Sequence, residues 1–222
     1  MAAPPEKTIH SLDGRWNLNK TLSNDPDPVL ALQGIGYLLR KAISYAPISL
    51  DFRQYEGPPN EGNDGAGADA SFTHIDIVQT VFKVSSTLEP RCLDYVWRAR
   101  TDKVFGEVEA RSRWVTLDEL VAAGLDEHLA QGWLTGEAEE EGKEEEGRAD
   151  GGEKRRRGQL VLTEARSTKN GKWDEKGGWT AWQVWGFREI GGERRHARNV
   201  VAKRGGEARR IVLYYDYVGP VA

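Results

Sequence analysis

The sequence predicts an all-β protein: a closed antiparallel up-and-down β-barrel with an N-terminal helix-turn-helix lid and a helical insertion. Three observations support this prediction. A short alternating strand comes first, a pair of short amphipathic segments follows, and from residue 48 onward apolar and polar residues alternate with a period of two. Closing such a series of strands into a barrel removes exposed sheet edges, and a helix pair can cover one end.

The first predicted element is a strand over residues 14–20, because Trp16 and Leu18 alternate with polar neighbours. Residues 1–10 precede it as a flexible tail. We assign 11–220 to one barrel domain, since an all-β barrel can use this length as a single unit. Trp16 is expected to plug one end of the barrel and to serve the fold, not the chemistry.

Two short helices are predicted next. Asp25 or Asp27 can cap the first helix, whose first turn tolerates proline, and Gly34 ends it. The second helix spans 35–45 and carries an apolar stripe that includes Leu38. Together they form an αα-hairpin that can act as a lid.

The remaining strands are predicted from period-two alternation and from the Gly-Gly and Asn-Gly turn signals between them. Their expected ranges are 48–55, 72–86, 92–100, 104–115, 158–167, 179–189, 194–203 and 209–218. A turn or bulge is expected to break the second of these into two.

Residues 117–157 are predicted to be an insertion between two strands. Its first part, 117–133, has the apolar spacing of a helix, with Thr116 or Asp118 as the N-cap. Its second part, 136–157, runs from an acidic block into a basic one and is predicted to be a disordered charged loop.

Composition narrows the function classes. The 222 residues carry a formal net charge of -4, so charge is nearly balanced and no nucleic-acid partner is expected. The single cysteine, Cys92, excludes an internal disulfide and indicates a reducing, cytoplasmic location. No stretch approaches the ~20 apolar residues of a membrane span. Because no metal-ligand spacing or phosphate-binding motif is present, we expect neither a metal nor a cofactor, and the oligomeric state stays open.

Three motifs near the N-terminus carry a family resemblance: GRWNL at 14–18, LALQGIG at 30–36 and RK at 40–41. In order and spacing they resemble the N-terminal signature of the intracellular fatty-acid-binding proteins, a branch of the lipocalin (calycin) superfamily. The run SSTLEP at 85–90 and the tyrosine-rich last strand are similar more loosely. The resemblance implies a barrel that encloses an apolar ligand.

The resemblance also implies that an Arg-x-Tyr pair on the last strand binds a carboxylate, because a buried carboxylate needs charge-assisted hydrogen bonds. This chain departs from that pattern, since Tyr215 stands two residues before Tyr217, where the arginine is expected. Arg209 and Arg210 lie at the start of the strand and are expected to face solvent. A bulky neutral or phenolic ligand is therefore favoured, such as a terpenoid, polyketide, sterol or other lipid.

The large rings are candidates for the cavity wall. Trp182 and Trp185 lie on one strand but on opposite faces, and packing of the barrel wall would explain such rings as well as ligand contact does. The candidate ligand-binding residues are Leu38, Phe52, Trp97, Trp182, Trp185, Tyr215 and Tyr217.

A polar cluster is the second candidate site. His74 and Asp76 share one face of a strand, and with Arg98 and Asp94 they could form a proton-transfer cluster inside the barrel. The alternative is that they coat the outer surface. For an enzyme, the candidate catalytic residues are His74, Asp76, Arg98 and Tyr217.

Two functions therefore remain open. The first is intracellular binding of a bulky hydrophobic small molecule in the barrel cavity. The alternative is a cofactor-independent cyclase or pericyclase of natural-product biosynthesis, such as a Diels-Alderase or hetero-Diels-Alderase, which would use the same cavity. Such catalysis needs mainly orientation and a few hydrogen-bond donors, so missing catalytic motifs do not exclude it.

Overall fold

The computed structural model describes residues 1–63, 65–67, 69–81, 85–135, 158–173 and 177–221. The strands are β1 (Gly14–Leu18), β2 (Ile48–Gly57), β3 (Phe72–Val81), β4 (Ser85–Cys92), β5 (Arg98–Asp102), β6 (Gly106–Val115), β7 (Leu160–Lys169), β8 (Lys172–Trp173), β9 (Trp179–Ile190), β10 (Glu193–Arg204) and β11 (Glu207–Gly219). The helices are α1 (Asp27–Leu32), α2 (Tyr37–Tyr45), α3 (Leu117–Ala122) and the short 3₁₀ helix η1 (Glu127–Ala130).

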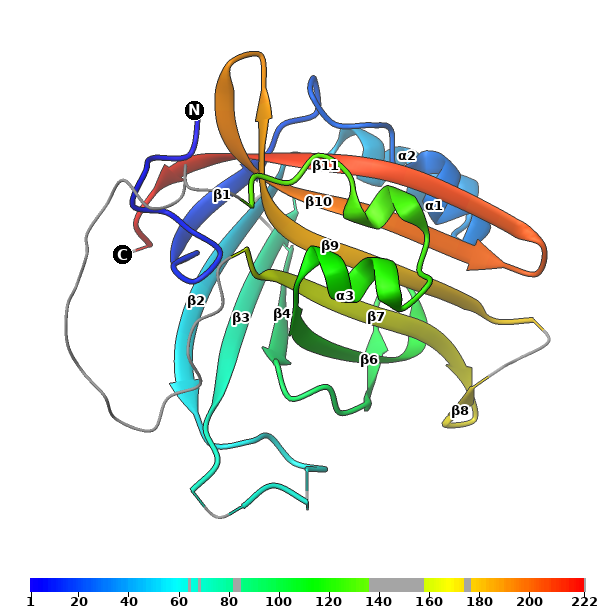
Figure 1. Ribbon diagram of the computed structural model, residues 1–222. Helices are drawn as coiled ribbons and strands as arrows, with labels where there is room; N and C mark the ends of the chain where they lie inside the picture. The colour runs from blue at the N-terminus through cyan, green and yellow to red at the C-terminus, as the bar shows by residue number, and fades with distance from the viewer. Residues whose placement is uncertain (64, 68, 82–84, 136–157, 174–176, 222) are drawn as a thin grey trace.

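Ten strands form one curled antiparallel sheet in the order β4-β3-β2-β1-β11-β10-β9-β7-β6-β5, and β8 pairs with β7 (Figure 1). The predicted all-β, up-and-down fold is confirmed. Among the described residues no ladder joins the edge strands β4 and β5, and side chains bridge this seam instead. Arg100 Nη2 of β5 lies 3.8 Å from Glu89 Oε1 of β4.

The seam also accounts for the largest difference from the predicted strands. The expected break in 72–86 is present, as β3 and β4, but β4 already ends at Cys92, and residues 93–97 form a loop in place of the predicted strand 92–100. Tyr95 in this loop has a positive φ of 61°, a backbone conformation that extended strands do not adopt.

The N-terminal segment closes one end of the barrel. Residues 1–10, predicted as a flexible tail, pack against the sheet: Ala3 and Ile9 are buried in one apolar cluster with Trp16. The Ala3 amide donates to the Arg194 carbonyl at 2.7 Å, and Trp16 Nε1 donates to the carbonyl of Leu12 at 2.9 Å. Trp16 is fully buried, as its predicted role as a plug requires.

The helix pair covers the opposite end. Val29 of α1 is buried in a cluster with Val200 of β10 and Ile211 of β11. α2 follows α1 at this end (Figure 1) and carries no buried residue. Leu38, predicted on an inward stripe of this helix, is 84% exposed. Within the described residues, no helix has the length and apolar character needed to cross a membrane.

The insertion packs on the outside of the sheet (Figure 1). Leu120 of α3 and Leu129 of η1 are buried against Leu162 of β7 and Val184 of β9. The predicted helix 117–133 is divided in two, because α3 ends before Gly124, which has a φ of +62°. The charged run at 136–157 lies outside the described residues.

Gly186 lets the insertion approach the sheet closely. A Cβ atom at Gly186 would lie 2.5 Å from Leu160 Cδ2 and 2.9 Å from Trp133 Cε3. We therefore expect Gly186→Ala to lower the free energy of unfolding by ~1–3 kcal/mol through overpacking, measured by urea denaturation. Gly206→Ala is the control, because nothing lies within 4 Å of its added Cβ. Equal stability of the two variants would contradict this close packing.

Candidate functional site

Strand alternation divides the sheet into a concave and a convex face. Side chains on the concave face form apolar clusters at the two ends of the barrel, one around Trp16 and one around Val29. Polar side chains lie between these clusters. We call this group the interior belt; it consists of Glu89, Arg91, Arg100, Gln183 and Arg198. Its members come from four strands that the sheet curvature brings together.

Glu89 on β4 is the acidic member of the interior belt. Its Oε2 lies 2.8 Å from Arg91 Nη2, and its Oε1 lies 3.8 Å from Arg100 Nη2. Burial raises the pKa of Glu89, but Arg91, Arg100 and Arg198 together outweigh burial and hold that pKa below its ordinary value. The carboxylate is therefore ionised at neutral pH and compensates part of the positive charge around it.

Arg91 shares a strand face with Glu89, two residues away. Burial lowers the pKa of Arg91 to about 10, against the opposing effect of Glu89, so the guanidinium still carries its charge at neutral pH. Its Cζ lies 5.3 Å from the ring centroid of Trp185 on β9. Trp185 Nε1 in turn donates to Gln183 Oε1 at 3.3 Å. This contact links the arginines to the amide member of the belt.

Arg198 on β10 has the most unusual surroundings. The residue is 7% exposed, and its Cζ lies 4.1 Å from the Trp185 ring centroid, 5.2 Å from that of Tyr215 and 5.7 Å from that of Phe52. Its Nε and Nη2 atoms are buried and have no hydrogen-bond partner among the described residues. A buried charged donor without a partner costs free energy, and such a group calls for an explanation.

The charges of the belt and its neighbour Asp102 do not balance. Arg100 lies 3.8 Å from Glu89 and 3.9 Å from Asp102, and Arg91 pairs with Glu89, so two acids face three guanidinium groups. The Nε atoms of Arg91 and Arg100 also lack a hydrogen-bond partner in the described part of the chain. Arg198 is the guanidinium for which the described residues supply no salt bridge, so one positive charge remains uncompensated.

His196 lies two residues before Arg198 on the same face of β10. It is fully buried, with its ring centroid 5.5 Å from that of Trp16, 5.4 Å from that of Tyr215 and 5.7 Å from that of Phe52. Burial, with a further contribution from Arg198, holds the pKa of His196 well below 6.5, so the ring is neutral. Its Nδ1 lies 3.1 Å from the carbonyl oxygen of Gly186, which places the proton on Nδ1.

The neutral state of His196 predicts how stability depends on pH. As the pH falls below 6.5, the unfolded chain binds a proton at this residue before the folded protein does, so the stabilisation present above pH 6.5 is lost. Between about pH 7.5 and about pH 5.5, we expect wild-type stability to fall by about 1.4 kcal/mol more than that of His196→Gln. Urea denaturation at both values measures this difference, and parallel losses would show that His196 does not contribute.

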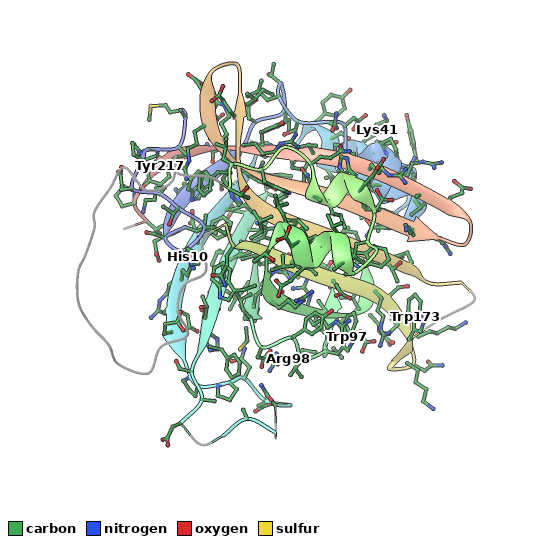
Figure 2. The ribbon with its side chains drawn as sticks, viewed as in Figure 1. His10, Lys41, Trp97, Arg98, Trp173 and Tyr217 are labelled. Atoms are coloured by element: carbon green, nitrogen blue, oxygen red, sulfur yellow. The ribbon has the colours of Figure 1, made fainter. Side chains whose placement is uncertain are left out.

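Three of the ligand-binding residues predicted from the sequence lie on the concave face beside Arg198. Phe52 and Trp185 contact each other edge to face, with ring centroids 6.4 Å apart, and Tyr215 is buried with them. Burial raises the pKa of Tyr215, so its hydroxyl stays protonated. Tyr217 lies farther along β11 at the plugged end, with its ring centroid 5.0 Å from that of Trp16 and near the N-terminus (Figure 2).

The structure does not bring the four residues of the predicted interior cluster, His74, Asp76, Asp94 and Arg98, together on the concave face. His74 and Asp76 alternate with Ile75 and Ile77, which occupy the concave face, so both point outward. His74 is nevertheless buried, because residues 58–63 cover it: its Nε2 lies 2.8 Å from the carbonyl oxygen of Pro58.

Arg98 lies at the start of β5, where it contacts the loop after β4 and residues 60–61. Its Nη2 donates to Asp94 Oδ2 at 2.6 Å and to the carbonyl of Asn60 at 3.1 Å. These contacts tie the loop after β4 to residues 58–63, and they give Arg98 a structural explanation. Tyr217, the fourth predicted catalytic residue, lies apart from Arg98 (Figure 2).

The other predicted ligand-binding residues also lie away from the interior. Trp97 lies between two guanidinium groups on the convex face, with Arg111 Cζ at 4.5 Å and Arg166 Cζ at 4.3 Å from its ring centroid. Trp182 packs with the cluster under the insertion. Leu38 on α2 is largely exposed.

Sequence reasoning missed the interior belt and His196, although a signal was present. In Glu89-Pro-Arg91 and in His196-Ala-Arg198, polar residues are spaced by two, so each pair shares one strand face. Val200 and Ala202 continue the face of Arg198 with apolar residues, and the structure turns this face inward. Across the described residues, no group of three or more His, Cys, Asp or Glu side chains is placed to hold a metal ion.

Comparison with curated proteins finds two relatives that match over the full length. The chain is 30% identical over 220 residues to scpY of Mollisia scopiformis, described as a probable pericyclase, covering 99% of this chain and 96% of that protein. It is 25% identical over 224 residues to the pericyclase pydY of an Acremonium species, covering both chains completely. A comparison with known family profiles finds no match.

Among solved structures, the chain is similar to the fluorescent protein UnaG, with 13% identity, a TM-score of 0.46 and coverage of 95% of this chain and 99% of that one. It is also similar to lipid binding protein 8 of Caenorhabditis elegans, with 10% identity, a TM-score of 0.45 and coverage of 93% and 94%.

Proposed function

The chain belongs to the family of the pericyclases scpY and pydY, and from this premise we propose that it is a cofactor-free pericyclase. Its substrate is a bulky, largely apolar molecule of natural-product biosynthesis, bound on the concave face of the barrel. A pericyclic ring closure moves electrons within the substrate, so every atom of the substrate is kept in the product. The protein has to supply orientation and stabilisation of the developing charge.

The observation that carries this proposal is the position of Arg198 among aromatic rings. A guanidinium with free Nε and Nη2 donors can bind an oxygen conjugated to the reacting double bond and withdraw electron density from it. The rings of Phe52, Trp185 and Tyr215 surround this guanidinium, and their flat faces can hold a polyene in the folded conformation that ring closure needs. The apolar clusters at both ends exclude water from the reacting atoms.

This proposal uses only part of the set of residues predicted from the sequence. Phe52, Trp185 and Tyr215 form the wall of the proposed site, and Tyr217 borders its plugged end. The remaining predicted residues are left out, because they face outward or, in the case of Arg98, contact loops: Leu38, His74, Asp76, Trp97, Arg98 and Trp182.

A carrier is the second candidate, because the same concave face would bind an apolar molecule without changing it. The extensive apolar lining at both ends favours such binding as much as it favours catalysis. The two candidates differ in what happens to the ligand, and fold alone does not decide between them.

An isomerisation assay tests the proposal. A synthetic linear polyene ketone, with a conjugated diene tethered to an enone, is incubated with the protein and followed by liquid chromatography with mass detection. We expect a product of unchanged mass, formed faster than without protein and enriched in one diastereomer. Heat-denatured protein is the control. A compound that binds but gives the uncatalysed rate and product ratio would support the carrier and contradict the pericyclase.

We also propose that the protein acts in the cytoplasm. The single cysteine, Cys92, is free and buried, which suits a compartment where disulfides do not form. Fractionation of cells producing the tagged protein tests this, and recovery from the secreted fraction would contradict it.

A further inference from the structure

We propose that the ligand of this barrel carries a delocalised oxyanion, two oxygens sharing one negative charge, and that Arg198 binds both oxygens through Nε and Nη2. This inference deepens the proposed function and rests on it, because it places the anion in the same site. It also differs from the sequence-based prediction of a neutral ligand, which rests on Tyr215 standing where an arginine is expected in the last strand.

The two unpartnered atoms of Arg198 lie on one edge of its guanidinium. In a planar guanidinium the Nε–H and Nη2–H bonds point the same way, so this edge matches two oxygens of one planar acceptor. Two other arginines of the chain use the same edge in this manner. Arg15 donates from Nε and Nη2 to Asp51 at 2.6 and 2.7 Å, and Arg210 donates to Asp126 at 2.8 and 2.7 Å.

Arg198 differs from these two arginines in burial and in pairing. Arg15 and Arg210 are half exposed on their side chains, whereas Arg198 is 7% exposed. The acid of the belt and its acidic neighbour are engaged elsewhere: Glu89 pairs with Arg91, and Asp102 accepts from the amides of Val104 and Phe105. The guanidinium edge that binds a carboxylate at the surface is thus also present in the interior. There, no carboxylate of the described residues binds it.

The charge of the interior belt selects an anion over a neutral acceptor. A neutral carbonyl would satisfy one donor and leave the uncompensated positive charge in a medium of low dielectric constant. An oxyanion satisfies both donors and also neutralises the charge. Trp185, whose ring centroid lies 4.1 Å from Arg198 Cζ, holds the guanidinium in place, so little freedom is lost when the anion binds.

Two chemical groups have this oxyanion: a carboxylate and the enolate of a 1,3-dicarbonyl compound. Both are planar, and both present two oxygens that fit the Arg198 edge. A binding experiment distinguishes the carboxylate from the enolate, because each acid can be compared with a neutral molecule of the same chain length.

Isothermal titration calorimetry on the full chain at about pH 7.5 tests the inference. The first pair of ligands is decanoate and decanol; the second is 2-decanoylcyclohexane-1,3-dione and its enol methyl ether. We expect at least one acid to bind about tenfold or more tightly than its neutral partner, as hydrogen bonds to a buried charge predict. A preference in the first pair alone identifies a carboxylate, and in the second pair alone an enolate. Equal affinities within both pairs would overturn the inference.

Variants show whether Arg198 causes the preference. Arg198→Gln should abolish it, whereas Arg209→Gln should retain it, because the Arg209 side chain is exposed near the start of β11. Arg198→Lys keeps the positive charge but lacks the paired Nε and Nη2 donors, so we expect this variant to lose most of the preference for the acid. Full acid preference in the lysine variant would show that charge alone suffices and would contradict two-oxygen binding. If Arg198→Gln does not fold, Arg198→Lys tests the role of Arg198 in its place.

The failure of this inference and the failure of the proposed function can be told apart. Acid preference without isomerisation of a polyene that carries the preferred acid group would overturn only the pericyclase. Isomerisation without acid preference would overturn only the oxyanion.

Discussion

The Arg198→Gln variant is expected to close the substrate ring about 10²- to 10³-fold more slowly than the wild type, the loss typical when one preorganised donor to a developing negative charge is removed. Its stability should be unchanged or higher. In the described residues Arg198 has no acidic partner, so its replacement removes an uncompensated buried charge. A fall in kcat with an unchanged or raised Tm would therefore identify Arg198 as a residue kept for function at the expense of stability.

The matched control for this experiment is Arg210→Gln. Arg210 is half exposed and pairs with Asp126 near η1, so we expect its loss to leave turnover unchanged. The rate is followed as formation of the isomer of unchanged mass, and Tm by circular dichroism. A glutamine variant of Arg198 with a wild-type rate, or with a clearly lowered Tm, would contradict the assigned role.

Trp16→Ala is expected to lower the free energy of unfolding by ~3–5 kcal/mol, the cost of a large-to-small change in a packed core. Trp16 is fully buried, and its ring lies edge to face with those of Phe187 and Tyr217, at centroid distances of 6.1 and 5.0 Å. Its Nε1 also ties the plugging segment to the barrel through the carbonyl of Leu12. Urea denaturation measures this loss.

Tyr37→Ala is the control for the tryptophan variant. Tyr37 on α2 is 62% exposed, so removing its ring should change the free energy of unfolding by less than ~0.5 kcal/mol. A loss below ~1 kcal/mol in Trp16→Ala would mean that the end of the barrel is not held by this side chain.

The strands were predictable because their evidence is local. The alternation around Trp16 and along 194–203 follows from the two faces of a strand, and the turn glycines mark where strands end. The prediction of elements failed where packing against distant strands, or the backbone conformation of one residue, overrides the local sequence pattern. Residues 1–10 look like a tail until the barrel end is present to bury Ile9, and Gly124 interrupts an otherwise helical spacing.

The candidate site was predictable only in part. Alternation alone places Trp185 and Trp182 on opposite faces of β9, and the structure turns Trp185 inward. Local patterns could not say that Leu38 stays exposed, because that depends on what α2 packs against. They could not place His74 outside either, since either face of a strand can become the inner one until the whole sheet curls.

The sequence alone therefore specifies the all-β barrel fold, the alternating faces of the strands and the aromatic residues available to line the interior. The tertiary structure decides which charges are compensated there. Arg198, Arg209 and Arg210 are alike as residues, but one lies buried on aromatic rings and two lie at the surface. The physical reason is that burial and ion pairing depend on contacts between strands far apart in the chain, and in a low-dielectric interior those contacts determine whether a charge is available to bind a ligand.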